Sequence, residues 1–480
     1  METDVQEIRY AAASGGVAPL TWSQEDMLRV MRALPGRHVH FNMTFSIVLP
    51  AGTRTGRVVD VLRAATENHE ALRTTVTDAA TDHPTQHVHG RGRLVLRLHA
   101  YEACDDTVVR EVSRLSRRTP VGFPGEETFR PDLILVDGQP HTLVLTFNHL
   151  TLDGFSVPVL NEDLLRRLSG SSGLPPAQSP RERAEFEQGP GGTAQSARSL
   201  RTLERNLASA PATPLRPVAG GGDPAPFWWG RMRSPSLAAV LPALAERYAV
   251  PTSAVLIGIV GSLLAPGAGA FAVSLVVANR FLPGLRASLG CYFQPVPLTV
   301  GVDNADFAET ARKTAAAVTR AAMNGQFAPS SLSGLLDQIE TETGRVLRPM
   351  PVFNVQEFAA APGALSPEAA RDLVAHSSYE STGLTGMEDD GLYLNATTRE
   401  GTLELVLRTR TDRMPAAAGE QLLRSVEDSA LALYERRAPS PAAAVPPASG
   451  RAPFVNMPGI PFCSCDTHAV DNAAVEEMAP

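Results

Sequence analysis

Residues 147–154 read FNHLTLDG, and they continue an apolar run, Thr142–Phe147, that predicts a buried strand. His149 therefore stands where a strand ends, a place from which an imidazole held in one tautomer is directed into a cleft, as a general base requires. Asp153 lies too far along the chain to orient that imidazole. We expect it to pair with an arginine and fix the loop, and Gly154 to let the backbone turn. From the spacing alone, a catalytic histidine and a buried core histidine both stay open.

Metal and hydrolase chemistry find little support around this histidine. His141 is the only further metal-binding side chain nearby, whereas zinc needs three or four protein ligands. The G-x-S-x-G motif of a serine nucleophile is absent, as are the glycine patterns of dinucleotide and P-loop sites. We therefore expect no metal ion and no bound cofactor.

The cysteines are too few and too scattered for a disulfide framework, which favours a reducing compartment; they are Cys104, Cys291, Cys463 and Cys465. The last two, with His468, leave three interpretations of the tail open: a weak zinc or redox site, a docking peptide, or a flexible end.

Composition indicates a globular chain of 480 residues, 43% of them hydrophobic, with a net charge of −8. Charges of both signs are dispersed, so we expect no nucleic-acid partner and no anionic membrane surface. The first ten residues lack the apolar stretch of a secretory signal, which favours the cytoplasm. Residues 254–278 carry no charge and are long enough to cross a bilayer, but Pro266-Gly267 interrupts them, so we expect a buried helix followed by a strand.

Apolar periodicity predicts helices and strands in alternation along the chain. Ser23 is expected to cap the first helix, and Asp137-Gly138 to form a hairpin turn. The helices are expected at 27–34, 58–69, 108–115, 196–207, 237–248, 252–264, 307–323 and 417–435, and the strands at 41–49, 72–76, 86–88, 94–98, 133–136, 142–147, 272–277, 352–358, 392–395 and 403–408. Gly, Pro, Ser and Ala dominate 170–222, which predicts a first lobe over 1–170, a linker over 171–222, a second lobe over 223–437 and a disordered tail over 438–480.

Several motifs in order resemble the condensation domains of nonribosomal peptide synthetases, in the chloramphenicol-acetyltransferase-like superfamily. In the first lobe these are PLTWSQ (19–24) through Leu28, NHEALRT (68–74), similar to RHExLRT, and NHLTLDG (148–154), similar to HHxxxDG. In the second lobe they are ANR (278–280) with LGCYFQPVPL (289–298), and the segments 327–336 and 351–356. The resemblance covers roughly residues 17–437.

The sequence departs from the family pattern at four places. Asn148 replaces the first motif histidine, and Asn279 replaces the glycine before Arg280. Gln294-Pro295 replaces Asn-Thr, and only residues 181–187 stand where a tryptophan motif is expected. We expect these changes to affect substrate identity more than function.

The resemblance implies an α/β fold of the α+β two-layer type, with two acetyltransferase-like lobes in a V-shaped pseudo-dimer and a channel between them. His149 would be the catalytic residue, and Asp153 would pair with Arg280 across the lobes. The Gly154 N–H would hold an oxyanion or the acceptor, with Ser156 as a further hydrogen-bonding group. Arg73 would support the core near the site, and we expect His69 to be structural as well.

The implied reaction transfers an acyl group from the phosphopantetheine thioester of a carrier protein to an amine, forming an amide in natural-product biosynthesis. No carrier motif and no adenylation segment is found, so we expect a free-standing, monomeric, cytoplasmic enzyme that meets its acyl or peptidyl carrier protein in trans. Two alternatives stay open. One is an ester-forming acyltransferase of the same fold with an alcohol acceptor, and the other is a non-catalytic docking domain.

Overall fold

The computed structural model describes residues 4–32, 38–123, 127–175, 177–215, 227–267, 269–282, 284–303, 305–356, 365–384, 391–399 and 401–436. These residues form two compact units. Unit 1 comprises the described residues up to Ala194 together with Ala278–Phe293, and unit 2 comprises Gln195–Val277 and the described residues from Gln294 onward. The cysteines and the histidine noted in the predicted tail lie outside the described residues.

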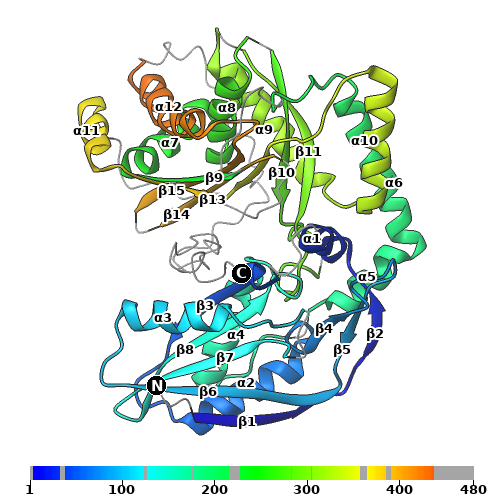
Figure 1. Ribbon diagram of the computed structural model, residues 1–480, viewed down its shortest axis with the longest axis vertical. Coiled ribbons are helices and arrows are strands. Elements are labelled where there is room, and N and C mark those ends of the chain that lie inside the picture. Colours follow the sequence, from blue (N-terminus) through cyan, green and yellow to red (C-terminus); the bar gives the residue numbers. More distant parts are fainter. Residues whose placement is uncertain are drawn as a thin grey trace. The chain divides into compact units, whose positions relative to one another are not determined.

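Unit 1 is built on a five-stranded sheet with the order β1-β6-β7-β8-β3 (Figure 1). Its strands are β1 (Asp4–Ala11), β3 (Asn42–Val48), β6 (Arg91–Tyr101), β7 (Arg130–Val136) and β8 (Gln139–Asn148). β7 and β8 form the predicted hairpin, whose turn residues Asp137 and Gly138 have φ values of 49° and 72°. Two positive φ values in succession match the type I′ turn that Asp-Gly favours.

The two faces of this sheet are covered differently. Helices α2 (Thr55–Asn68) and α4 (Ser156–Leu168) pack on the apolar face, where Leu143, Leu145 and Phe147 are buried. Helix α3 (Asp106–Arg117) packs on the opposite face, which also carries buried polar side chains. The end of β8 therefore lies between an apolar layer and a polar layer.

The rest of unit 1 lies beside the five-stranded sheet. A three-stranded sheet has the order β2-β5-β4, and short helices flank it. These elements are β2 (Gly16–Pro19), β4 (Thr74–Thr77), β5 (Thr85–Val88), α1 (Trp22–Arg32), η1 (His38–Phe41), η2 (Glu70–Arg73) and α5 (Pro180–Gln188). Helix α6 (Pro190–Leu207) contains the boundary between the units.

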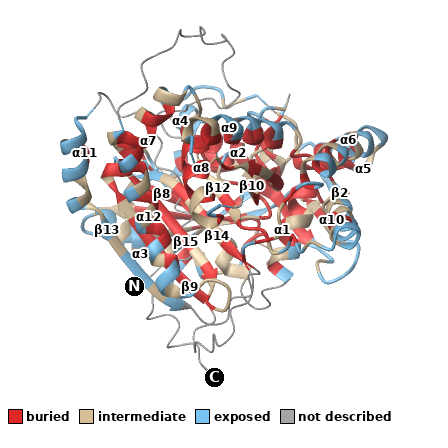
Figure 2. Cartoon of the chain, turned by 90° about the horizontal axis from the view of Figure 1, so that it is seen from above, coloured by how far each residue is buried: buried red, intermediate tan, exposed pale blue. Residues whose placement is uncertain are grey.

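Unit 2 is built on a seven-stranded sheet with the order β11-β10-β12-β14-β15-β9-β13. Its strands are β9 (Phe227–Ser234), β10 (Ala270–Val277), β11 (Gln294–Gly301), β12 (Val352–Val355), β13 (Ser378–Leu384), β14 (Leu392–Arg399) and β15 (Thr402–Arg410). Its other helices are α7 (Pro235–Tyr248), α8 (Thr252–Leu264), α9 (Phe307–Met323), α10 (Pro329–Thr343), α11 (Pro367–Asp372), η3 (Leu373–His376) and α12 (Ala416–Glu435). Figure 2 shows that α8 is largely buried, whereas α11 is mostly exposed.

The four central strands repeat between the units. The order β6-β7-β8-β3 in unit 1 matches β12-β14-β15-β9 in unit 2, and each neighbouring pair has the same sense: parallel, antiparallel, antiparallel. In both units the hairpin is followed by a long helix, α4 or α12. The predicted two-lobe fold of mixed helix and sheet is therefore confirmed.

The structure differs from the sequence-based expectations at several points. Strands β1, β2, β9, β11 and β13 and helices α4, α5, α10 and α11 were not predicted. Ser23 lies inside the first turn of α1 instead of capping it. Residues 171–222, expected to be a linker with one helix at 196–207, contain α5 as well as α6, which begins earlier than predicted. Ala278–Phe293, expected in the second lobe, packs in unit 1. The uncharged stretch forms α8 and β10, as predicted. Among the described residues no single helix is long and apolar enough to cross a bilayer; α7 and α8 qualify by length and composition only as a pair, and they are bent by 101°.

Candidate active site

His149 is the first residue after β8. Its main-chain N–H donates to the carbonyl oxygen of Phe41, at 2.9 Å, which ties the start of the loop to the end of η1. The residue is half-buried, and its ring faces that of Phe293 with 4.9 Å between the centroids and 57° between the planes. The Nδ1 atom is buried and has no hydrogen-bond partner within the described part of the chain.

The environment of His149 keeps its imidazole neutral near pH 7. Burial lowers the pKa of His149 below its ordinary value, although the main chain of His149 itself, the carboxylate of Asp153 and the main chain of Leu152 act in the opposite direction. A neutral imidazole has a lone pair with which to accept a proton. The histidine is therefore in the protonation state that a base needs.

Asp153 is fully enclosed by protein groups, with 1% of its surface exposed. Its Oδ1 accepts from the N–H and the hydroxyl of Ser156, at 2.9 and 3.0 Å, and from the guanidinium of Arg280. Its Oδ2 accepts from the N–H of Tyr292, at 3.1 Å, and its own N–H donates to the carbonyl of Gly290, also at 3.1 Å. We call these five residues the Asp153 network.

Arg280 connects the residues of this network to one another. Its Nη1 donates to the carbonyls of Leu285 and Ser288, and its Nη2 donates to Asp153, to the Ser156 hydroxyl at 2.9 Å and to the Gly290 carbonyl at 3.2 Å. The guanidinium carbon also lies 4.8 Å from the centroid of the Tyr292 ring. The Asp153–Arg280 pair expected from the resemblance is therefore present. Both residues belong to unit 1, so within the structure the pair does not link two lobes.

Ser156 is saturated by this network. Its hydroxyl lies 3.0 Å from Asp153 Oδ1 and 2.9 Å from the Gly290 carbonyl, and it accepts from the Gly290 N–H at 3.0 Å. With Arg280 as a further donor, its hydrogen-bonding capacity is used within the protein. Ser156 locks the loop and is not a free donor for a substrate.

Gly154 has a different property from the one the sequence suggested. Its φ is not positive, and a Cβ built on it would meet no atom within 4 Å, so the turn does not require glycine. Among the described residues its N–H has no hydrogen-bond partner. The glycine therefore leaves open space beside an unused donor, close to His149 in the sequence.

The departure at Asn279 has a conformational explanation. Asn279 has a φ of 56°, in the left-handed region that favours glycine and that asparagine adopts more readily than most residues. Its side-chain N–H donates to the carbonyl of Tyr292, at 2.9 Å, across the base of the segment Ala278–Phe293. Asn279 thus adopts a backbone conformation that glycine would also permit, and its side chain adds a tether.

The first family motif also contacts this loop. Gln24 Nε2 donates to the carbonyl of Leu150, at 3.1 Å, and the Thr21 hydroxyl donates to the carbonyl of Cys291, at 3.3 Å. These contacts connect residues at the start of α1 to the loop of His149 and to Ala278–Phe293. Three motifs that lie far apart in the sequence therefore meet in unit 1.

The second motif serves a separate part of unit 1. Arg73 is buried and donates to the carbonyls of Ser14 and His89, at 2.7 and 2.9 Å. His69 Nε2 lies 3.4 Å from a carboxylate oxygen of Asp163 on α4. Within the described residues, the hydrogen bonds and ion pairs of Arg73 and His69 are made to residues outside the His149 loop, so both have structural surroundings.

No group of three or more His, Cys, Asp or Glu side chains that could hold a metal ion is found in the described ranges. His141, the only nearby candidate from the sequence, shares a hydrogen bond between its Nδ1 atom and the hydroxyl of Thr142, at 2.9 Å. Burial raises the pKa of the Cys291 thiol well above its ordinary value, so it is no ready nucleophile.

The structure has two units with a repeated strand order, and unit 1 carries an HxxxDG loop. Comparison with known proteins gives relatives with these features. Residues 14–181 match the Condensation domain family. The PKS-NRPS hybrid synthetase cheA of Chaetomium globosum is 25% identical over 341 residues, which cover 67% of this chain and 7% of that protein. Bacitracin synthase 2 of Bacillus licheniformis is 22% identical over 189 residues, covering 39% of this chain and 7% of that one. The chain thus spans under a tenth of the length of these relatives.

Solved structures give the same fold at low sequence identity. One such structure concerns condensation domain-mediated chain release from the enacyloxin polyketide synthase. It matches with a TM-score of 0.68 and 18% identity, and the match covers 92% of this chain and 86% of that one. The epimerization domain from the third module of tyrocidine synthetase B has a TM-score of 0.63 and 17% identity, covering 89% and 98%. The resemblance to condensation domains of peptide and polyketide synthetases is therefore confirmed. An epimerization domain shares the same fold.

Proposed function

We propose that this protein is a condensation enzyme that transfers an acyl group from the phosphopantetheine thioester of a carrier protein to an amine, forming an amide. The observation that carries the proposal is the neutral, half-buried imidazole of His149 on a loop fixed by the Asp153 network. A thioester is already activated, so the protein has to align two reactants and move one proton.

A single proton-transferring group, His149, is sufficient for this reaction. The amine nitrogen attacks the thioester carbonyl carbon while the imidazole takes a proton from the nitrogen. The carbon–sulfur bond then breaks, and the same proton passes to the leaving thiolate, which releases the free thiol of the carrier. The open space and the unused N–H at Gly154 suit the oxygen that becomes negatively charged during the attack.

The partners follow from this reaction. The donor would be an acyl or peptidyl carrier protein acting in trans, and the protein would need no bound cofactor, because the carrier supplies the phosphopantetheine arm. The acceptor would be a small amine, free or on a second carrier. An alcohol acceptor, which would give an ester, is the alternative within the same fold.

Intact-mass measurement of loaded carriers tests the proposal. A panel of acyl-carrier proteins is mixed with the protein and with matched amine and alcohol acceptors, and the carrier mass and the small product are followed. We expect loss of the acyl group only with protein and amine present, with appearance of the amide. Ester product alone would favour the alternative reaction, and no transfer with any pair would favour a docking domain.

A further inference from the structure

Asn148, the residue where the loop leaves the family pattern, connects two parts of unit 1. It is fully buried, and its Oδ1 accepts from the N–H of Leu150 at 3.0 Å. Its Nδ2 donates to the Oδ1 of Asn42 at 3.2 Å. One carboxamide therefore fixes the turn that follows His149 and links that turn to β3.

Asn42 continues this connection to the end of α3. It is also fully buried, and its Nδ2 donates to the main-chain carbonyls of Arg117 and Thr119, at 2.9 and 2.7 Å. Because its two N–H groups face two carbonyls, its oxygen has to face Asn148. Asparagine supplies one acceptor and two donors in this arrangement, which neither aspartate nor leucine does.

The main chain reinforces the side-chain contacts. Asn42 and Asn148 stand directly opposite each other in the β3–β8 pairing, and the N–H of His149 donates to the carbonyl of Phe41. Residues 41 and 42 therefore hold the backbone of His149 and the side chain of the residue before it. Residues 148 and 149 are thus attached to β3 and to the end of η1 at two points.

We propose that Asn42 is a positioning residue for His149, acting through Asn148 to anchor the loop to the C-terminal end of α3. This inference rests on the proposed function in so far as its effect is read from acyl transfer. A structural residue would change stability alone, whereas a positioning residue changes the turnover of bound substrate.

The chain offers a matched control in unit 2. Asn354 on β12 and Asn395 on β14 also stand opposite each other, and Asn354 Nδ2 donates to Asn395 Oδ1 at 3.0 Å. Asn354→Ala removes an amide pair of the same chemistry that lies within the sheet of unit 2. It separates loss of an amide pair from loss of positioning.

Two readouts test the proposal: kcat against KM in the acyl-transfer assay, and the ring resonance of His149 in isotopically labelled protein, assigned with His149→Ala. We expect Asn42→Ala to lower kcat by about 10- to 100-fold with KM nearly unchanged, because a small misplacement of a reacting group has that effect. It should also shift the His149 resonance. Asn354→Ala should leave both unchanged, and Asn42→Ser, which keeps a shorter polar group, should fall between.

Unchanged kcat and an unchanged His149 resonance in folded Asn42→Ala would overturn the proposal. If Asn42→Ala does not fold, Asn42→Ser decides by the same criteria. If the wild-type protein transfers no acyl group, the proposed function fails, but the resonance still decides whether Asn42 sets the environment of His149. A shift there supports the positioning, and none contradicts it.

Discussion

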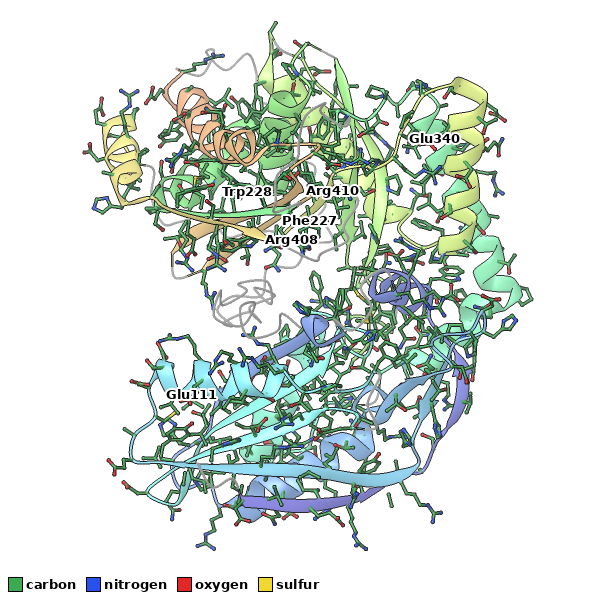
Figure 3. All side chains as sticks on the ribbon, viewed as in Figure 1. Glu111, Phe227, Trp228, Glu340, Arg408 and Arg410 are labelled. Carbon is green, nitrogen blue, oxygen red and sulfur yellow. The ribbon has the colours of Figure 1, made fainter. Side chains whose placement is uncertain are left out.

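The two hairpins that precede α4 and α12 have the same place in their units but end in different loops. After β8 comes the loop of His149, whose aspartate is enclosed by the Asp153 network. After β15 comes a loop whose aspartate, Asp412, pairs with Arg410 at 3.0 and 2.8 Å, with about a third of each side chain exposed. Figure 3 labels Arg410 and Arg408 on β15 beside Phe227 on β9, and Arg410 lies 5.7 Å from the Phe227 ring centroid.

The same strand order in both units therefore does not determine the polar contacts of the loop that follows the hairpin. The hairpin strands of both units carry buried apolar residues at alternating positions, Leu143 and Leu145 on β8 and Leu405 and Leu407 on β15, which pack in the core with the helices. The loop is independent of that pattern, because its polar groups either face water or find partners from elsewhere. In unit 1 the distant segment Ala278–Phe293 supplies partners of Asp153, whereas Asp412 after β15 pairs with Arg410 on the strand itself.

The largest expected effect is on stability when the arginine of each pair is removed. Arg280→Ala leaves a buried carboxylate without its cation, which costs about 3–5 kcal/mol of unfolding free energy. Arg410→Ala removes a partly exposed pair and should cost under about 1 kcal/mol. Urea unfolding of both variants measures this difference.

A double-mutant cycle provides the control. Asp153→Asn also lowers stability, but with Arg280→Ala the two losses should not add, because the residues share one interaction. Additive losses, or equal costs for Arg280→Ala and Arg410→Ala, would mean that burial of the network does not distinguish the two loops.

A second prediction concerns α4, the helix that follows the loop of His149. Asp163 on α4 is buried; burial raises its pKa, but the hydrogen bonds of His69 and Arg167 outweigh this and lower the pKa to about 2. A lowered pKa stabilises the folded state above the unfolded value near 4, and this contribution is lost as the pH falls toward 2. Asp163→Asn should therefore remove about 1–2 kcal/mol at pH 7 and flatten the acid limb of the stability curve.

Unfolding of the wild type and of Asp163→Asn measured between pH 2 and 7 checks this prediction. A wild-type acid limb in Asp163→Asn would contradict it.

A third prediction separates stability from activity at Gly154. Because an added Cβ meets no atom within 4 Å and φ is not positive, Gly154→Ala should unfold within about 0.5 kcal/mol of the wild type. The methyl group would occupy the space beside the free N–H, so acyl transfer should fall at least about 10-fold. Full activity in this variant would remove Gly154 from the site.

The smallest expected effect is a shift in pH dependence. Since burial lowers the pKa of His149, kcat/KM should stay level through neutral pH and fall only below the ordinary histidine range, where the imidazole is protonated. Phe293→Ala admits water to the His149 ring and should move this limb to higher pH by about half a unit, while the effect of the Asp153 carboxylate on the pKa of His149 stays the same. A limb that moves to lower pH would contradict a desolvating role for Phe293.

The sequence predicted the apolar elements well and the polar contacts poorly. Helix 55–68 and the Asp137-Gly138 turn follow from local periodicity and turn chemistry. Strand β1, with its exposed charged residues, and β11, with Pro295 and Pro297 at a sheet edge, lack such a pattern.

The site shows the same limit. The pair of Asp153 and Arg280 joins residues 127 positions apart and was expected only because of the family resemblance. Asn42 gave no signal at all, because a single asparagine at the start of a strand has no pattern. Its partners, the carbonyls at the end of α3, are set by tertiary packing.

The central claim is that His149, held by this loop, handles the proton of acyl transfer. Its most direct test is intact-mass measurement of transfer by His149→Ala, with His141→Ala on the same strand as the control. We expect a loss of at least about 100-fold for His149→Ala, with unchanged thermal unfolding, and near wild-type transfer for His141→Ala. Wild-type transfer by folded His149→Ala would contradict it.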